Sequence, residues 1–165
     1  KGRTVLNAFS YTGAEGLYAL KGGAKNVLFL DSSKDALEEV SQNAALNKIP
    51  KTKIKTECMD AFDWFSAHSD VQGGHGGAEK SGKQRVTFGM VVIDPPALIK
   101  NMHTVEPGKK AYHFLNRSAM SLVENSGIFA TSSCSRFLSE VDFEYLLRRA
   151  SVQAGVRLEL IAKIK

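Results

Sequence analysis

Two side chains that could take part in a reaction stand at or shortly after the ends of apolar runs that resemble β-strands. Cys134 follows the apolar stretch 127–131, and Asp94 follows the apolar residues 91–93. The carboxyl ends of parallel strands meet at one edge of an open α/β sheet, where such folds bind and react. A thiol there could act as a nucleophile, and a carboxylate could hold or deprotonate a substrate. On spacing alone, Cys134 could equally be a small buried residue at a strand end.

The elements that would position these groups alternate between strand-like and helix-like patterns. The expected strands span 4–9, 26–30, 53–58, 86–93, 127–131 and 156–164. The expected helices span 13–20, the segment capped by Ser32 or Ser33, 60–67, 111–123 and the segment capped by Ser139. This alternation predicts an α/β fold with a doubly wound, parallel sheet and right-handed crossovers.

Composition limits the class of protein. A chain of 165 residues forms one domain, 1–165, and has no apolar run long enough to cross a membrane. Its two cysteines lie far apart, which favours free thiols and a reducing, cytoplasmic location over a disulfide framework. The formal charge of +5 permits an anionic partner such as nucleic acid without requiring one.

The stretch 69–85 interrupts the alternation and predicts a flexible insertion. It contains a near-match to a phosphate-binding loop, Gly77 to Lys83, but Gln84 stands where that motif needs Ser or Thr. The stretch also precedes a strand instead of joining a strand to a helix. We therefore interpret it as a surface loop, and His75 within it as a histidine without ligand companions.

Polar residues after the first three strands could hold an adenosine-type cofactor. Gly13 and Gly16 in the first strand-to-helix turn would let a ligand approach the backbone. Asp31 ends the second strand, where an acidic residue can accept hydrogen bonds from ribose hydroxyls. Asp60 follows the third strand and could reach an adenine amine. Either carboxylate could instead cap the helix that follows it.

Five segments together resemble a known family. They are Asn7-Ala8-Phe9-Ser10-Tyr11-Thr12-Gly13, Asp31-Ser32-Ser33, Asn43-Ala44-Ala45-Leu46-Asn47, Asp94-Pro95-Pro96 and Ser133-Cys134-Ser135. The chain resembles the catalytic domain of class I S-adenosylmethionine-dependent methyltransferases, in particular the PUA-containing bacterial 23S rRNA cytosine-C5 type. The resemblance implies a mostly parallel Rossmann-like sheet with helices on both faces. It also leads us to expect a fragment without the PUA domain and the seventh strand.

The same resemblance implies S-adenosyl-L-methionine as cofactor, RNA as substrate, specifically 23S rRNA, and no metal. The implied cofactor-binding residues are Phe9, Ser10, Tyr11, Thr12, Gly13, Asp31, Ser32, Asp60, Ala61 and Asp94. The implied catalytic residues are Cys134 and Asp94, and the implied substrate-binding residues are Pro95, Pro96 and Lys100. The basic residues Lys100, Lys109, Lys110 and Arg117 are expected at the mouth of the site, where they would meet phosphates or form a solvated face.

By the same resemblance, Cys134 distinguishes the cytosine-C5 family from related rRNA methyltransferases, because a related guanine-N7 enzyme has no cysteine at this position. A thiolate that adds to C6 of cytosine makes C5 nucleophilic enough to accept a methyl group. The target base must leave its stack to reach such a pocket. Two alternatives stay open: methylation of a guanine or adenine base with Cys134 incidental, and a non-catalytic RNA-binding or assembly module that retains the fold.

Overall fold

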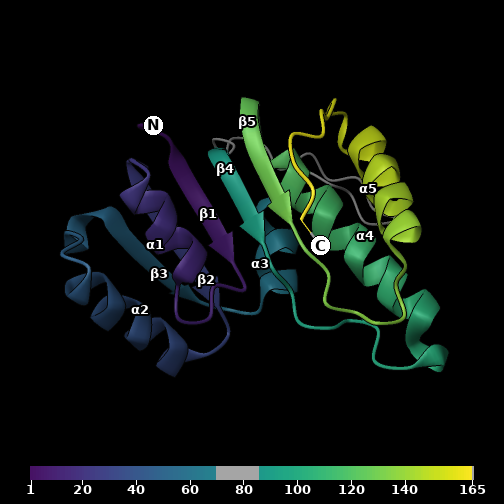
Figure 1. Cartoon of the computed structure of the whole chain (residues 1–165), viewed down its shortest axis with the longest axis horizontal. Coiled ribbons are helices and arrows are strands. Elements are labelled where there is room, and N and C mark those ends of the chain that lie inside the picture. Colours follow the sequence, from purple (N-terminus) through teal and green to yellow (C-terminus); the bar gives the residue numbers. More distant parts are fainter. Residues whose placement is uncertain (70–85, 165) are drawn as a thin grey trace.

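The computed structural model describes residues 1–69 and 86–164, which form a five-stranded parallel sheet between layers of helices (Figure 1). The strands are β1 (Thr4–Ala8), β2 (Asn26–Asp31), β3 (Ile54–Cys58), β4 (Phe88–Ile93) and β5 (Val123–Thr131). Their order across the sheet is β3-β2-β1-β4-β5, and all neighbours run parallel. The strand order therefore reverses between β1 and β4, which is where open α/β sheets form their binding crevice.

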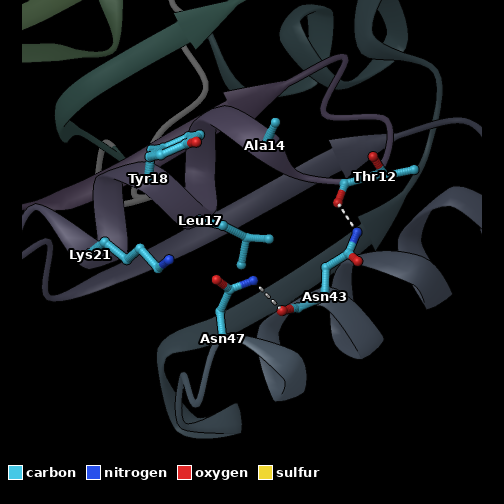
Figure 2. A pocket seen from close by; sticks show the side chains of 7 residues that line it. All are labelled: Thr12, Ala14, Leu17, Tyr18, Lys21, Asn43 and Asn47. Carbon is cyan, nitrogen blue, oxygen red and sulfur yellow. Dashed lines mark hydrogen bonds between the residues drawn. The ribbon is translucent and has the colours of Figure 1, made fainter.

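Two helices cover one face of the sheet. α1 (Ala14–Lys21) and α2 (Lys34–Leu46) bury leucine and valine side chains against Val27 and Phe29 of β2. A shallow hollow of about 180 Å³ lies between these two helices (Figure 2). It is lined by Thr12, Ala14, Leu17, Tyr18, Lys21, Asn43 and Asn47. The short 3₁₀ turn η1 (Lys51–Lys53) then leads into β3.

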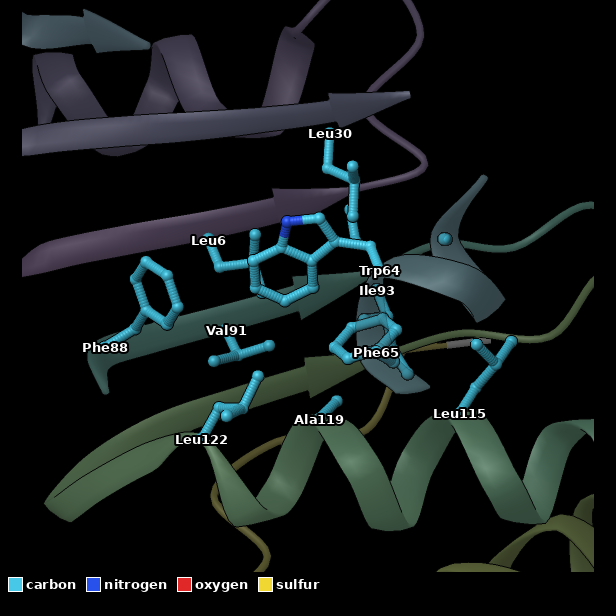
Figure 3. Packing of buried hydrophobic residues seen from close by; sticks show 12 residues of the cluster. Leu6, Leu30, Trp64, Phe65, Phe88, Val91, Ile93, Leu115, Ala119 and Leu122 are labelled. Carbon is cyan, nitrogen blue, oxygen red and sulfur yellow. The ribbon is translucent and has the colours of Figure 1, made fainter. Parts of the chain in front are cut away.

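The opposite face carries the larger part of the core (Figure 3). α3 (Ala61–His68) contributes Trp64 and Phe65, and α4 (Val105–Ser121) contributes Leu115 and Ala119. The 3₁₀ turn η2 (Met102–Thr104) precedes α4. α5 (Glu140–Ala154) packs on α4, where the Tyr112 and Phe143 rings meet edge to face at 5.8 Å. The expected α/β class, the doubly wound sheet and the helices on both faces are confirmed.

Three helix caps agree with the sequence. The Ser33 hydroxyl accepts a hydrogen bond from the Ala36 amide at 3.2 Å, and the Ser139 hydroxyl accepts one from the Asp142 amide at 3.1 Å. Asp60 caps α3 in the same way. Serine and aspartate at these positions satisfy amides that have no partner inside the helix.

The bounds around α4 differ from the prediction. The helix begins at Val105 instead of residue 111, because Pro107 falls in its first turn, where a missing amide costs no helical hydrogen bond. The helix stop expected at 125–127 is wrong, since β5 already begins at Val123. Ser126 has a φ of 59° within that strand, and its carbonyl accepts a hydrogen bond from Arg3 Nη1 at 2.6 Å. The strand continues through a register irregularity opposite Phe88 and Met90.

The final strand expected at 156–164 is also wrong. Gly155 ends α5 with a φ of 68°, and the following residues pair with no strand among the described residues. Lys163 instead forms ion pairs with Glu140 and Glu144 of α5. The alternating apolar pattern is compatible with a strand, but a strand forms only where a neighbour completes its hydrogen bonds.

Some expectations concern residues that the structure does not describe. The insertion expected at 69–85, including the near-match at 77–83 and His75, lies outside the described residues except for Ser69. In the two described stretches, no helix combines the length and the apolar character that a membrane span requires.

Candidate functional site

The loop between β1 and α1 has an unusual backbone. Phe9 and Tyr11 have positive φ values of 58° and 46°, and Gly13 has a φ of 90°. Non-glycine residues rarely adopt this region, and such strain concentrates at binding and active sites. Two backbone–backbone hydrogen bonds help to hold the loop, from the Ser10 amide to the Leu30 carbonyl at 3.1 Å and from the Gly13 amide to the Ser10 carbonyl at 2.7 Å. Strand β1 therefore ends at Ala8, one residue earlier than the sequence predicts.

Asp31 fixes this loop from the end of β2. Its Oδ2 accepts a hydrogen bond from the Tyr11 amide at 2.8 Å, and its Oδ1 accepts one from the Ser33 amide at 2.9 Å. A carboxylate offers about four acceptor positions, so Asp31 retains capacity for further donors. Ser33, not Asp31, caps α2. The structure thus places the Asp31 carboxylate against the Tyr11 amide in the loop that follows β1.

Two asparagines support the loop from behind. The buried Asn7 of β1 accepts a hydrogen bond from the Gly16 amide at 3.0 Å, and Asn43 of α2 donates to the Thr12 carbonyl at 3.1 Å. A Cβ on Gly16 would stand 2.3 Å from the Phe29 ring, so only glycine allows this approach of α1 to the sheet. The role of Asn7 had one signal in the sequence, a polar residue inside an apolar strand.

Two buried polar atoms near this loop have no protein partner. Among the described residues, Asn7 Nδ2 and Ser10 Oγ make no hydrogen bond, although both residues are almost fully buried. A buried polar group without a partner is costly, so these atoms suit a polar ligand or a water. The surroundings of β1 therefore fit a cofactor that brings hydrogen-bonding groups.

Three further residues expected to bind the cofactor, Ser32, Asp60 and Ala61, make different contacts in the structure. Asp60 uses Oδ1 to accept from the Phe62 and Asp63 amides at 2.8 and 3.2 Å, so it acts as the cap of α3. Ala61 is buried in the core. Ser32 is exposed, and its carbonyl lies 3.5 Å from the Cys58 thiol. All three stand at the carboxyl edge of the sheet.

The loops that carry Asp94 and Cys134 meet at the ends of β4 and β5. The Ser132 hydroxyl donates to Asp94 Oδ1, and the Ser132 amide donates to the Ile93 carbonyl at 3.3 Å. The Cys134 thiol lies 3.8 Å from the Pro95 carbonyl. Cys134 is an exposed residue, and the contact of its thiol with Pro95 is part-buried. The two loops that carry the expected nucleophile and carboxylate are therefore in direct contact.

The prolines after Asp94 differ in exposure. Pro95 is buried, and Pro96 is exposed next to it. Two successive prolines fix the backbone and exclude a helical continuation at this point. The other free cysteine, Cys58, is also exposed, but it ends β3 at the far edge of the sheet. Of these two thiols, Cys134 is therefore the one that lies beside the Asp94 loop.

The basic residues do not form one cluster. Lys100 is exposed in the loop after Asp94. Lys109 lies 3.4 Å from Asp142. The pKa of Asp142 is lowered mainly by the hydrogen bond from Ser139 and to a smaller extent by Lys109. Arg117 lies about 12 Å further along α4 than Lys109. It contacts Gln153 at 3.5 Å, toward the amino edge of the sheet, so its expected place at the mouth of the site is wrong.

Metal ligation finds no support in the described part of the chain. Within 1–69 and 86–164, no three histidine, cysteine, aspartate or glutamate side chains gather in a group that could hold an ion.

Comparison with known proteins shows that the chain is similar to methyltransferases. The chain is 34% identical over 164 residues to ribosomal RNA large subunit methyltransferase I of Tolumonas auensis, covering 99% of this chain and 38% of that protein. It is 31% identical over 163 residues to the protein of the same name from Cronobacter sakazakii, again covering 99% and 38%. The chain thus spans well under half of the length of these relatives. No protein-family model matches it.

Solved structures agree on the fold. The crystal structure of SMU.776, a protein assigned as a methyltransferase and complexed with SAH, superposes with a TM-score of 0.71 at 25% identity. That match covers 90% of this chain and 36% of the other. The chain therefore has the Rossmann-like α/β fold of S-adenosylmethionine-dependent methyltransferases.

Proposed function

We propose that this chain is the catalytic domain of an S-adenosylmethionine-dependent methyltransferase that forms 5-methylcytosine in large-subunit rRNA, of the PUA-containing 23S rRNA type. The observation that carries the proposal is the contact between the Cys134 loop and the Asp94 loop at the carboxyl edge of the sheet. The similarity to rRNA large subunit methyltransferase I supports the RNA substrate. With its free thiols, the domain would work in the cytoplasm.

The cofactor half of the site lies over β1, β2 and β3. Asp31 would receive the ribose hydroxyls, and the backbone from Phe9 to Gly13 would approach the methionine part. Ser32 and the segment at Asp60 and Ala61 would border the adenine. When bound, S-adenosylmethionine supplies an electrophilic methyl group on a positively charged sulfur. Asp94, at the switch point beside β1, would stand between this half and the substrate half.

The substrate half would carry out covalent catalysis. The Cys134 thiolate forms a bond to C6 of a flipped cytosine, and the electron pair displaced from the C5–C6 double bond makes C5 nucleophilic. C5 would then take the methyl group as the methyl–sulfur bond of the cofactor breaks, and S-adenosylhomocysteine would leave. A base removes the C5 proton, the double bond re-forms, and the sulfur–C6 bond breaks to return Cys134. Asp94 would hold N3 and the exocyclic amine of the adduct, and Pro95 and Pro96 would form a rigid wall for the base.

A transfer assay tests the function as a whole. The chain is incubated with methyl-labelled S-adenosylmethionine and a 23S rRNA transcript, and the labelled nucleoside is identified after digestion. Label in 5-methylcytidine supports the proposal. Label in a guanosine or adenosine would leave a methyltransferase with another target, and binding of RNA without transfer would favour a non-catalytic module.

Asp31→Ala is expected to weaken S-adenosylmethionine binding by about 1–3 kcal/mol, the usual cost of leaving buried polar partners unsatisfied. The variant loses the acceptor for the ribose and the two hydrogen bonds that hold Tyr11 and Ser33. Isothermal titration calorimetry measures the change. Asp35→Ala, which removes an exposed acid in the first turn of α2, is the matched control. Unchanged affinity in a folded Asp31→Ala protein would remove Asp31 from the site.

Lys100→Ala is expected to weaken binding of an rRNA fragment and to reduce the salt dependence of that binding. A lysine that neutralises one phosphate contributes about one unit to the slope of log K against log salt. Lys25→Ala provides the control, because Lys25 is exposed just before β2, at the opposite edge of the sheet. Fluorescence anisotropy at a series of salt concentrations gives both slopes. Equal slopes for the two variants would exclude Lys100 from the RNA contact.

A further inference from the structure

The Tyr112 hydroxyl contacts both residues that flank Cys134 in the sequence. The Tyr112 hydroxyl of α4 accepts a hydrogen bond from the Ser133 hydroxyl at 2.9 Å and lies 2.9 Å from the Ser135 hydroxyl. The Ser135 amide also donates to the Ser133 hydroxyl at 3.3 Å. Ser133 and Ser135 thus turn their side chains toward Tyr112, while Cys134 between them is exposed.

The same network reaches the loop that carries Asp94. The Ile99 amide donates to the Ser135 hydroxyl at 3.1 Å, and Ile99 ends the segment that begins with Asp94 and the two prolines. Two hydrogen bonds thus join the loops, one between Ser132 and Asp94 and the other between Ser135 and Ile99. Tyr112 is the side chain from outside both loops that holds Ser135 in this place.

Burial makes this network strong. Tyr112 is fully buried, and Ser135 is 5% exposed. The Tyr112 ring packs edge to face on Phe143 and lies in a cluster with Leu138 and Leu146. A hydrogen bond in such an apolar setting is stronger than in water, and a buried phenol left without partners is costly. The ring sets the position of the hydroxyl, and the hydroxyl sets the position of the loops.

We propose that Tyr112 is a positioning residue that holds the Cys134 sulfur at its working place beside the Asp94 loop. The inference rests on the proposed function, because it assigns Cys134 the role of nucleophile. Tyr112 itself touches no reacting atom. Its effect on the rate arises because small displacements of a nucleophile cost large factors in rate.

Tyr112→Phe removes the hydroxyl and keeps the ring, so it tests the hydrogen bonds separately from the packing. We expect kcat for methylation of a 23S rRNA transcript to fall about tenfold or more, within the range known for small misplacements of reacting groups. We expect KM for S-adenosylmethionine to stay the same, because the cofactor half is held by Asn7, Asp31 and Asn43. A change confined to KM, or no change in kcat, would overturn the proposal.

A second readout needs neither RNA nor cofactor. In a Cys58→Ser background, Cys134 is the single cysteine of the chain, and its alkylation by iodoacetamide can be followed by mass spectrometry. Tyr112→Phe and Ser135→Ala should each raise the alkylation rate severalfold, because the freed loop moves the thiol away from the Pro95 carbonyl. Ser135→Thr keeps a hydroxyl and should restore a rate near that of the background protein. Ser151→Ala, which removes a buried hydroxyl inside α5, is the matched control and should have no effect.

The combination of variants separates positioning from general loosening. Tyr112→Phe and Ser135→Ala act on one network, so the double variant should change the alkylation rate no more than the larger single change. Independent, multiplying effects would overturn the shared network, as would a wild-type rate in both single variants. If Tyr112→Phe does not fold, Ser133→Ala and Ser135→Ala carry the same test. Failure of the proposed function would show differently, as methylation at a normal rate by Cys134→Ala, whatever the alkylation rates are.

Discussion

Replacing Cys134 by alanine is expected to abolish methylation of 23S rRNA while S-adenosylmethionine still binds. Without the sulfur, no bond forms to C6, and C5 of cytosine stays a poor nucleophile, so the rate should fall by at least about 10³-fold. Cofactor affinity should persist because the loops over β1, β2 and β3 share no hydrogen bond with Cys134 among the described contacts. Transfer of labelled methyl groups and calorimetry measure the two properties on the same preparation.

Cys58→Ala is the control for this change, since it removes the other exposed thiol and should retain activity. A transcript that carries 5-fluorocytidine adds a direct test of the covalent bond. Fluorine at C5 cannot leave as the proton does, so wild-type protein should remain attached to the RNA and migrate more slowly on a denaturing gel. Normal methylation by Cys134→Ala would refute the cytosine-C5 assignment and favour a guanine or adenine target.

Asp94→Ala is expected to lower kcat by about 10²–10⁴-fold, the range by which positioned acid–base groups contribute to catalysis. The carboxylate stands beside Ser132 at the end of β4, where it can hold the base that Cys134 attacks. Loss of this contact should also slow the formation of the 5-fluorocytidine adduct. Single-turnover kinetics with labelled cofactor measures the chemical step separately from binding.

Ser132→Ala distinguishes the carboxylate from its hydrogen-bond partner. It leaves Asp94 charged and removes the hydroxyl that donates to it, so its effect should be much smaller than that of Asp94→Ala. If Asp94→Ala forms the adduct and transfers methyl groups at the wild-type rate, Asp94 has no part in catalysis. A loss of cofactor affinity alone would place it in the cofactor half.

The sequence predicted β1, β2 and β4 well because these strands are short, mostly apolar runs. β2 and β4 are buried on both faces, and such strands are nearly continuous in apolar residues. Helix starts were readable at Ser33, Asp60 and Ser139, where a side chain must satisfy free amides. The end of α4 and the strand expected at 156–164 were not, because both depend on neighbours that local pattern does not reveal.

The site was predictable in part for the same reason. Residues at or shortly after the ends of strands, such as Asp31, Asp94 and Cys134, are brought to one edge by topology alone. The roles of Tyr112 and Asn43 depend on how helices dock, so no spacing in the chain points to their partners Ser135 and Thr12. The role of Asp60 has no distinct signal in the sequence, because helix capping and ligand binding favour the same residue type at the same place.

The active edge of this molecule is assembled from two separately anchored parts. α2 secures the β1 loop through Asn43, and α4 secures the β5 loop through Tyr112, with the parallel strands β1 and β4 between them. Substitutions in one part should therefore combine with those in the other by simple addition of their free energies. For a protein engineer, this means that residues on the α4 side could be varied to select for a new target base without further changes to the residues of the cofactor half.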